Sequence, residues 1–596
     1  MTNGRPAGYL NFTLHAHLPY VVNHGTWPHG MEWMLEAATE TYLPLLRVLG
    51  RLQADGIALK ANLNLSPILL EQLAHPVFKT ELPEYLGRKI AAAREDEGCF
   101  LRAGDEQMAE TARRWIAYFT QALDDFTALG ADIIAGFRRF NDAGMIEIIT
   151  SAATHGYFPL LGTDESVVAQ IRTGAATHRK HIGTPARGMW APECGYRPAG
   201  LWQTPVTPEG SPGPWPPFAR IGVEEALYQG GIGYFFVDTH LVEDSVSYTP
   251  YDLLQSAEHG AQENGVGESG IEESAAEELQ SSAYWKTVYK PYLVDGPNTR
   301  EHRTYVFPRD PRTGLQVWSG ETGYPGDGAY LDFHKKRWPG GHRYWQVTHA
   351  KADLGLKTPY YPERAAARAR AHAEHFVSVV RQTLAAGLNA KPDEERPPIL
   401  VSPFDAELFG HWWHEGPEWL EHVARLVARD DVPIALISCG EYLDKYPPSA
   451  SIGLKEGSWG KHGDNHVWLN PETSWTWKHI YPAEAVVRAI ATEGAWRDGG
   501  SGERIMKQLC RELLLIESSD WQFLITTGPA RDYAEARFMT HIDQFKTIEQ
   551  AWRAFEKTGT LGSEMEAALK TIEERDSIFA EIDPSQWATG SQFERA

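Results

Sequence analysis

The chain has 596 residues, is 42% hydrophobic and carries a formal net charge of −23 at pH 7, so it can bury a large core, and its acidity argues against a nucleic-acid partner. No run approaches the roughly 20 apolar residues that span a bilayer and the N-terminus lacks the apolar core of a signal peptide, so we expect no membrane partner and a cytoplasmic location. Single, scattered cysteines argue against a disulfide framework and a zinc-thiolate site: Cys99, Cys194, Cys439 and Cys510.

Short β-like runs alternate with helical stretches over about the first 445 residues. Helical residues 110–130, for example, precede the third run. Such alternation predicts an α/β fold with a parallel sheet, and a barrel is the expected arrangement, with its chemistry at the C-terminal ends of the strands. The expected strands are residues 10–17, 58–65, 145–152, 187–192, 234–242, 304–310, 399–407 and 433–441.

Two insertions interrupt the alternation. Residues 203–220 are rich in proline and are expected to form a loop. Residues 254–283 are rich in Glu, Ser and Gly, which predicts a mobile, solvated excursion. Both insertions fall between strand ends, where a lid over a site would be built.

The pattern changes after Tyr446. Apolar residues now recur three and four positions apart, which predicts an antiparallel helical domain over residues 446–596, after a catalytic domain at 1–445. The expected helical runs are residues 483–496, 503–523, 531–559 and 563–581.

Two acidic residues follow strand-like runs in unusual surroundings. Glu193 lies in GMWAPECGY (188–196), and Asp405 lies in VSPFDAELFGHWWHEG (401–416), close to Glu407 and His411. Strand ends of one barrel would bring both acids to the same rim. Two carboxyl groups facing one cavity are the minimum for cleaving a glycosidic bond, with one as nucleophile and one as proton donor. Either acid alone could instead be a helix cap or an ion-pair partner.

Tryptophan is abundant, with 21 residues, and several lie in polar, glycine- or proline-rich surroundings. Indoles placed beside polar groups suit stacking on the apolar faces of sugar rings, although ordinary packing is the alternative for each one. The tryptophans concerned are Trp27, Trp190, Trp318, Trp345, Trp412, Trp413, Trp459 and Trp468.

His15 and His17 alternate at the end of the first strand and so share one of its faces. They could be a metal pair of an amidohydrolase-like barrel, with His155, His240 or His411 as further ligands. They could also bind sugar hydroxyls, or be core histidines with satisfied hydrogen bonds. Spacing alone leaves these alternatives open.

Five segments, in order, resemble the motif regions of glycoside hydrolase family 57 over residues 8 to 560. They are HAHLPYV (15–21), EIITSAATHGYFPLL (147–161), MWAPECGY (189–196), VSPFDAELFGHWWHEG (401–416) and SWGKHGDNHVWLN (458–470). Residues 307–327, FPRDPRTGLQVWSGETGYPGD, further resemble the 1,4-α-glucan branching enzymes of that family.

The resemblance implies an incomplete (β/α)7 barrel with an inserted subdomain, followed by an α-helical C-terminal domain that completes a glucan cleft. It implies a retaining mechanism with Glu193 as nucleophile and Asp405 as acid/base, His15 and His17 at the donor subsite, and neither metal nor cofactor. A covering loop would carry a tyrosine, for which Tyr248 and Tyr251 are candidates. The implied glucan-binding residues are Arg309, Gly326, Trp459, Asp520, Trp318 and Trp468, and Trp27, in the loop after the first strand, is a further candidate.

We therefore expect an enzyme that cleaves an α-1,4 bond of amylose or glycogen and transfers the chain to a 6-hydroxyl. The alternatives are an α-amylase or 4-α-glucanotransferase of the same family, a metal-dependent amidohydrolase or deacetylase, and a non-catalytic glucan-binding protein. The paired acids oppose the last, and sensitivity to chelators would mark the metal enzyme. The sequence leaves the oligomeric state open, with a monomer as the simplest case.

Overall fold

The computed structural model describes residues 6–243, 287–297, 303–319, 323–349, 351–389, 396–429, 431–448 and 450–590. The expected insertion at 254–283 lies outside these residues, as do Tyr248 and Tyr251. None of the helices within the described ranges is both long and apolar enough to span a membrane.

One curled sheet forms the centre of the molecule. Seven strands follow one another in parallel in the order β10-β1-β2-β3-β4-β7-β9, which confirms the α/β fold and the incomplete (β/α)7 barrel, and β11 is an eighth parallel strand off this path. β8 pairs antiparallel with β9, β12 pairs with β8, and β11 pairs with β1. The strands are β1 (Gly8–Ala16), β2 (Ala61–Leu65), β3 (Ile146–Ser151), β4 (Gly188–Trp190), β7 (Tyr234–Val237), β8 (Tyr292–Val294), β9 (Tyr305–Pro308), β10 (Ile399–Asp405), β11 (Ile434–Leu436) and β12 (Ser451–Ile452).

The sheet curves because its inner side chains pack on one another. Tyr9, Trp190, Phe236, Phe307 and Val401 belong to one buried cluster although they come from β1, β4, β7, β9 and β10. Burying a side chain of this size is worth about 1.5–3 kcal/mol, so filling the inside favours the curled form. The curl brings the two ends of the seven-strand path together: the backbone N–H of Asp310, just after β9, donates to the carbonyl of Val401 in β10 at 2.9 Å.

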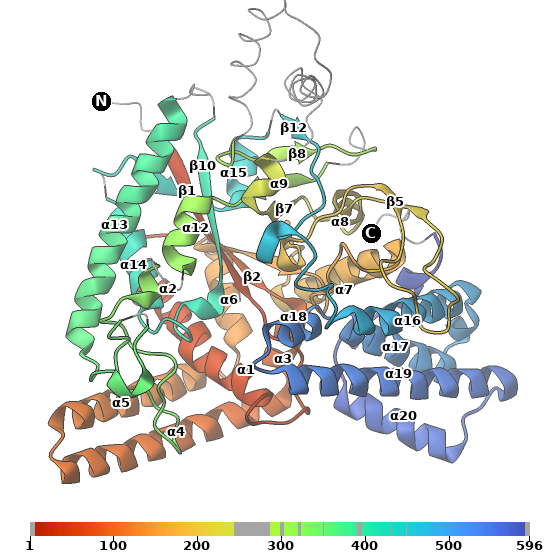
Figure 1. The fold of residues 1–596 in the computed structure, drawn as a ribbon, viewed down its shortest axis with the longest axis horizontal. Coiled ribbons are helices and arrows are strands. Elements are labelled where there is room, and N and C mark those ends of the chain that lie inside the picture. The colour runs from red at the N-terminus through yellow and green to blue at the C-terminus, as the bar shows by residue number, and fades with distance from the viewer. Residues whose placement is uncertain are drawn as a thin grey trace, which may run out of the picture.

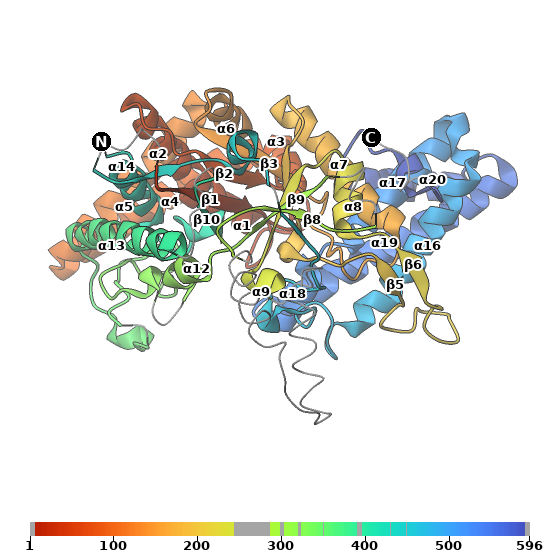
Figure 2. The same cartoon turned by 90° about the horizontal axis from the view of Figure 1, so that it is seen from above.

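Helices cover the outside of the sheet. Figure 1 shows the long α4–α5 pair and α13 on one side of the sheet, and Figure 2 shows these helices from above. The expected helix at 110–130 is confirmed as part of α5. The helices before residue 446 are α1 (Met31–Ala37), α2 (Leu43–Ala54), α3 (Pro67–Ala74), α4 (Pro76–Ala103), α5 (Glu106–Ala128), α6 (Ile133–Asp142), α7 (Asp164–Ile182), α8 (Val223–Gln229), α9 (Thr239–Glu243), α12 (Pro311–Trp318), α13 (Pro362–Asn389), α14 (Gly416–Val427) and α15 (Cys439–Lys445).

The helical part after residue 446 lies on the other side of the sheet, drawn in blue in Figures 1 and 2. The expected helices at 483–496, 531–559 and 563–581 correspond to α16, α19 and α20. The expected run at 503–523 is wrong as one helix, because the chain breaks at 517–519 and Asp520 begins a separate helix. These helices are α16 (Ser474–Glu493), α17 (Gly500–Ile516), α18 (Asp520–Thr527), α19 (Arg531–Thr558) and α20 (Ser563–Arg575).

The proline-rich segment at 203–220 is mostly irregular, as expected, but its last three residues are a strand. β5 (Gly200–Trp202) and β6 (Phe218–Arg220) pair antiparallel, so the segment is a hairpin with a long connection. That connection contacts the helical part: the backbone N–H of Glu209 donates to the carbonyl of Lys478 in α16 at 2.8 Å.

Candidate active site

A cavity of about 1110 Å³ lies at the carboxyl ends of the parallel strands. Ten of the side chains expected at the site line it, and they come from both the barrel and the helical part. Gly326 does not line it; it ends the short turn Tyr324–Gly326. The ten residues are His15, His17, Trp27, Glu193, Arg309, Trp318, Asp405, Trp459, Trp468 and Asp520.

Glu193 is held by an unusual backbone and by one tryptophan. It lies in a single turn after β4 with φ 59° and ψ 25°, in the left-handed region that residues other than glycine seldom adopt. The indole N–H of Trp459 donates to Glu193 Oε2 at 2.7 Å, and the backbone N–H of Trp459 donates to the Glu193 carbonyl at 3.0 Å. Strained conformations of this kind cluster at functional sites, where neighbouring contacts hold them.

Asp405 is the last residue of β10 and lies opposite His15 in the pairing of β10 with β1. Glu407, two residues on, also lines the cavity. Its Oε1 accepts hydrogen bonds from the hydroxyl of Tyr42 at 2.5 Å and from the backbone N–H of His17 at 3.3 Å. Tyr42 ends a π-helical turn, Ala38–Tyr42, a local irregularity that is frequent near functional sites.

Burial raises the pKa of all three acids. The pKa of Glu193 rises to about 7, mainly by desolvation; the Trp459 hydrogen bond opposes this shift, and the charges of Asp405 and Asp520 add to it. The pKa of Asp405 rises to about 8 by desolvation and by the nearby charge of Glu407, whose own pKa desolvation raises to about 7. Near neutral pH one acid can therefore be ionised while the other keeps its proton, as acid–base catalysis requires.

Three imidazoles stack beside these acids. The rings of His17 and His155 lie 4.1 Å apart, and that of His15 lies 5.0 Å from His155, all within 25° of parallel. Nitrogen lone pairs lie in the ring planes, so stacked rings do not direct them at one ion. Each ring instead has a protein partner: His15 Nδ1 lies 2.6 Å from Asn64 Oδ1, His17 Nε2 lies 3.1 Å from Asp520, and His155 Nδ1 lies 2.8 Å from a serine hydroxyl. The other candidate ligands do not join this stack: His240 contacts the Gly463 carbonyl, and His411 contacts Glu40.

Aromatic rings form much of the cavity wall. The ring of Trp459 lies 6.1 Å from that of Trp318, and the guanidinium of Arg309 lies 5.8 Å from the Trp459 ring. Trp468 is buried and stacks on Tyr157 at 4.2 Å. The expectation of stacking tryptophans is wrong for Trp190 and Trp413, which are buried and lie outside the lining, and Trp345 also lies outside it.

Some lining residues carried no signal in the sequence. Trp338 lies in a segment without a strand or a motif, and Trp33 lies in an ordinary helical pattern. Glu407 and Trp412 line the cavity as neighbours of Asp405 in the chain. Closeness to that acid was the sequence signal for Glu407, and Trp412 was also among the tryptophans in polar surroundings.

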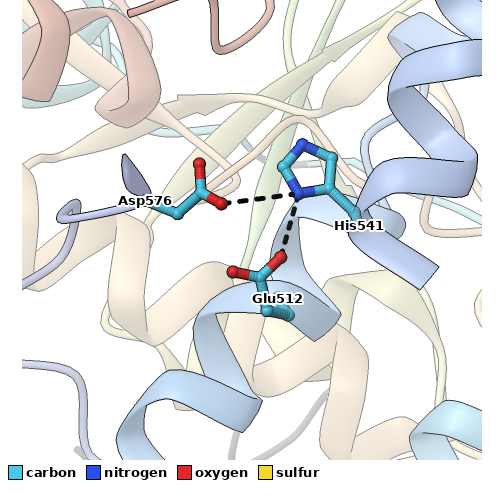
Figure 3. A group of neighbouring side chains, drawn as sticks. All are labelled: Glu512, His541 and Asp576. Carbon is cyan, nitrogen blue, oxygen red and sulfur yellow. Dashed lines mark hydrogen bonds and ion pairs between the residues drawn. The ribbon is translucent and has the colours of Figure 1, made fainter. Parts of the chain in front are cut away.

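One buried cluster elsewhere has the composition of a metal site. Glu512, His541 and Asp576 lie in the helical part, with His541 Nδ1 2.9 Å from Glu512 Oε2 and 4.0 Å from Asp576 Oδ2 (Figure 3). The side-chain amide of Gln544 donates to both carboxylates, at 2.9 and 2.7 Å, and Arg537 lies 3.1 Å from His541 Nε2. N–H donors therefore already occupy the site, which fits a hydrogen-bonded network better than a cation.

Family models match most of the chain. A model of glycosyl hydrolase family 57 matches residues 11–455, and a model described as 1,4-alpha-glucan branching enzyme, C-terminal, matches residues 479–587. The chain is 40% identical over 581 residues to a 1,4-alpha-glucan branching enzyme of Thermococcus kodakarensis, which covers 96% of this chain and 78% of that protein.

Solved structures with a similar fold agree with these family matches. The fold is similar to the crystal structure of a GH57-type branching enzyme from Pyrococcus horikoshii, with a TM-score of 0.84 and 37% identity over 98% of this chain and 97% of that one. It is also similar to the α-amylase AmyC from Thermotoga maritima, with a TM-score of 0.76 and 26% identity over 97% and 99% of the two chains.

Proposed function

The chain belongs to glycosyl hydrolase family 57, and from this membership and its paired acids we propose that it is a 1,4-α-glucan branching enzyme. One observation carries the proposal: Glu193 and Asp405 line a single aromatic cavity in a chain that is 40% identical to a named branching enzyme over almost its whole length. The enzyme cleaves an α-1,4 bond and transfers the released chain to a 6-hydroxyl of an α-glucan.

The first step forms a covalent intermediate. The ionised carboxylate of Glu193 attacks C1 of a glucose unit, while Asp405 gives its proton to the glycosidic oxygen as the C1–O4 bond breaks. The raised pKa of Asp405, about 8, keeps the donor protonated near neutral pH. The hydrogen bond from Trp459 stabilises the ionised form of Glu193 and orients its carboxylate.

The second step transfers the chain. Asp405, now ionised, accepts the proton of an acceptor hydroxyl, whose oxygen forms a bond to C1 and releases Glu193. A 6-hydroxyl gives an α-1,6 branch, whereas water gives hydrolysis. Bulk water is at about 55 M, so branching requires an acceptor held at a high effective concentration and an enclosed cavity. The aromatic wall and the buried histidines support such an enclosure.

We place amylose and glycogen-like glucans as substrates, glycogen biosynthesis as the process, and the cytoplasm as the location. Net retention at C1 follows from the two displacements at Glu193. We also propose a catalytic domain at 1–445 and a helical domain at 446–596, which the family matches at 11–455 and 479–587 support.

Linear amylose tests the proposal. The purified protein should produce few new reducing ends at first and many after treatment with a debranching enzyme. Glu193→Gln keeps the shape of the side chain and removes the nucleophile, so it should abolish both signals while glucan binding persists. Full activity of this variant would overturn the assigned nucleophile.

Similarity to AmyC makes α-amylase activity the second candidate. Reducing ends that appear without debranching would show that water, not a glucan hydroxyl, takes the glycosyl group. In that case the same two acids act, and only the acceptor differs.

A further inference from the structure

Two large indoles lie exposed at the rim of the cavity. Trp27 is 64% exposed and Trp338 is 60% exposed, and both line the cavity. Their rings meet edge to face, with centroids 6.1 Å apart and planes at 81°, so together they form an open corner. Residues 311 positions apart in the chain thus build one exposed apolar patch, and exposed apolar patches beside a cavity are typical of ligand-binding surfaces.

The turn that carries Trp338 is fixed to the barrel by polar contacts. Arg337 Nε donates to Asp96 Oδ1 of α4 at 2.7 Å, and the hydroxyl of Tyr344 donates to Asp96 Oδ2 at 2.8 Å. Lys89, also in α4, donates to the carbonyl of Gly340 at 3.0 Å. Asp96 is buried, so these contacts hold the turn firmly while its indole points outward. A rigid support lowers the entropy cost of binding on the exposed ring.

A continuous wall joins this corner to the proton donor. His411 lies six residues after Asp405 in the chain, and its ring lies 5.3 Å from that of Phe333. The ammonium of Lys336 lies 5.5 Å from the centre of the Phe333 ring. Lys336 is two residues before Trp338 in the chain. All five residues line the cavity, so the wall runs from Asp405 toward Trp338, which lies in the inserted segment 319–361 between α12 and α13.

The position of the proton donor indicates what this wall binds. Asp405 protonates the oxygen of the departing chain, so that chain leaves past Asp405, and the acceptor whose hydroxyl replaces it enters from the same side. We propose that Trp338, beside the expected glucan-binding residue Trp27, extends the cavity into an outer subsite for the α-glucan acceptor chain and sets how often the glycosyl group passes to glucan and not to water. This inference rests on the proposed branching function.

The occupant that fits best is a sugar polymer. The faces of α-glucose carry C–H groups that stack on indoles, while its hydroxyls need polar partners at the ring edges. Glu32 and Lys336 also line the cavity and offer an acceptor and a donor. The corner is continuous with the cavity that holds the catalytic acids. A surface for an unrelated partner would not need to lie beside these acids.

The test compares transfer with hydrolysis in Trp338→Ala. Loss of one stacking contact should lower the number of branches formed per bond cleaved by about 2- to 10-fold, while cleavage of a short maltodextrin stays near the wild-type rate. Trp338→Phe keeps an aromatic face and should retain most of the branching. Leu356→Ala is the matched control, because Leu356 is 70% exposed on the same inserted segment but lies outside the cavity lining.

A binding measurement separates this inference from the proposed function. In the Glu193→Gln background, which cannot turn over, adding Trp338→Ala should weaken binding of a long maltodextrin by about 2- to 10-fold and leave maltose binding unchanged. Unchanged affinity together with an unchanged branching ratio would overturn the inference while wild-type branching stands. A wild-type protein that only hydrolyses amylose would overturn the proposed function and the acceptor role with it.

Discussion

Glu407 lies two residues after Asp405 in the lining of the cavity, and it acts on Asp405 through its charge. Wild-type activity should rise with pH as Glu193 ionises, with a pKa of about 7, and fall as Asp405 loses its proton, with a pKa of about 8. Ionised Glu407 raises the pKa of Asp405, so Glu407→Gln should lower that pKa. The alkaline limb of kcat/KM against pH should therefore move to lower pH.

A second buried glutamate provides the control. Glu415 also has a raised pKa of about 7, but it bonds to Tyr360 at 2.7 Å and lies outside the cavity lining. Glu415→Gln should leave the alkaline limb in place. An unshifted limb in Glu407→Gln would show that Glu407 does not set the protonation of Asp405.

The sequence predicted which side chains share the cavity better than it predicted their geometry. Glu193, Asp405 and the histidine pair could be chosen because each follows a strand-like run at a point where a barrel would place its chemistry. The left-handed backbone of Glu193 could not be foreseen, because it depends on Trp459, 266 residues later in the chain. Trp338 could not be foreseen either, since its exposure depends on contacts with Asp96 of α4.

Among the elements, the connection after β1 depends on a contact with the helical part. The hydroxyl of Tyr20 donates to the carbonyl of Arg575 at 3.0 Å, and His24 Nε2 lies 2.6 Å from Asp576 Oδ1. The same connection carries Trp27 to the rim of the cavity. Burial opposes ionisation of Asp576, but the hydrogen bond from His24 and the neighbouring histidine charges hold its pKa below the usual range.

His24→Ala leaves Asp576 buried without this partner. The free energy of unfolding should fall by about 1–3 kcal/mol at neutral pH, and the KM for amylose should rise because Trp27 loses its support. Since the pKa of Asp576 is lower in the folded state, the contact stabilises the fold above the unfolded value of about 3.9 and its contribution is lost as pH falls further.

Chemical denaturation of the two proteins side by side measures the effect. His349→Ala, at an exposed histidine, should change the free energy of unfolding by less than about 0.5 kcal/mol. Equal stability of His24→Ala and wild type would show that the connection is held by its other contacts.

The break between α17 and α18 shows why the sequence did not predict this helix boundary. Helical periodicity continues through 517–519, so the pattern predicts a single helix. The barrel instead engages these residues: the backbone N–H of Ser519 donates to the His155 carbonyl at 3.2 Å, and its hydroxyl bonds to His155 Nδ1 at 2.8 Å. Tertiary contacts thus interrupt the helix and place Asp520 at the cavity.

For the whole molecule, the barrel and the helices share one core. A continuous cluster of buried apolar side chains extends from Leu10 in β1 to Trp587 near the end of the described chain. The fold class could be predicted from the alternation of strands and helices, but this shared core could not, because amphipathic helices do not reveal what their apolar faces cover.

The shared core predicts cooperative unfolding. Differential scanning calorimetry should give one heat-absorption peak for the full chain, because separating the helical part would expose apolar surface on both sides. Two well-separated peaks would show that the barrel and the helices are stable independently. Glucan binding at the cavity between them should move a single peak to higher temperature.

The contact of His17 with Asp520 joins residues 503 positions apart. A ribosome makes the chain from its N-terminus, so β1 and β10, and with them both proposed catalytic acids, emerge before α18 exists. A nascent chain therefore holds the reactive groups before it holds the wall that completes their cavity. The enzyme becomes able to pass a glycosyl group between glucans only after α18 has emerged and docked onto the barrel.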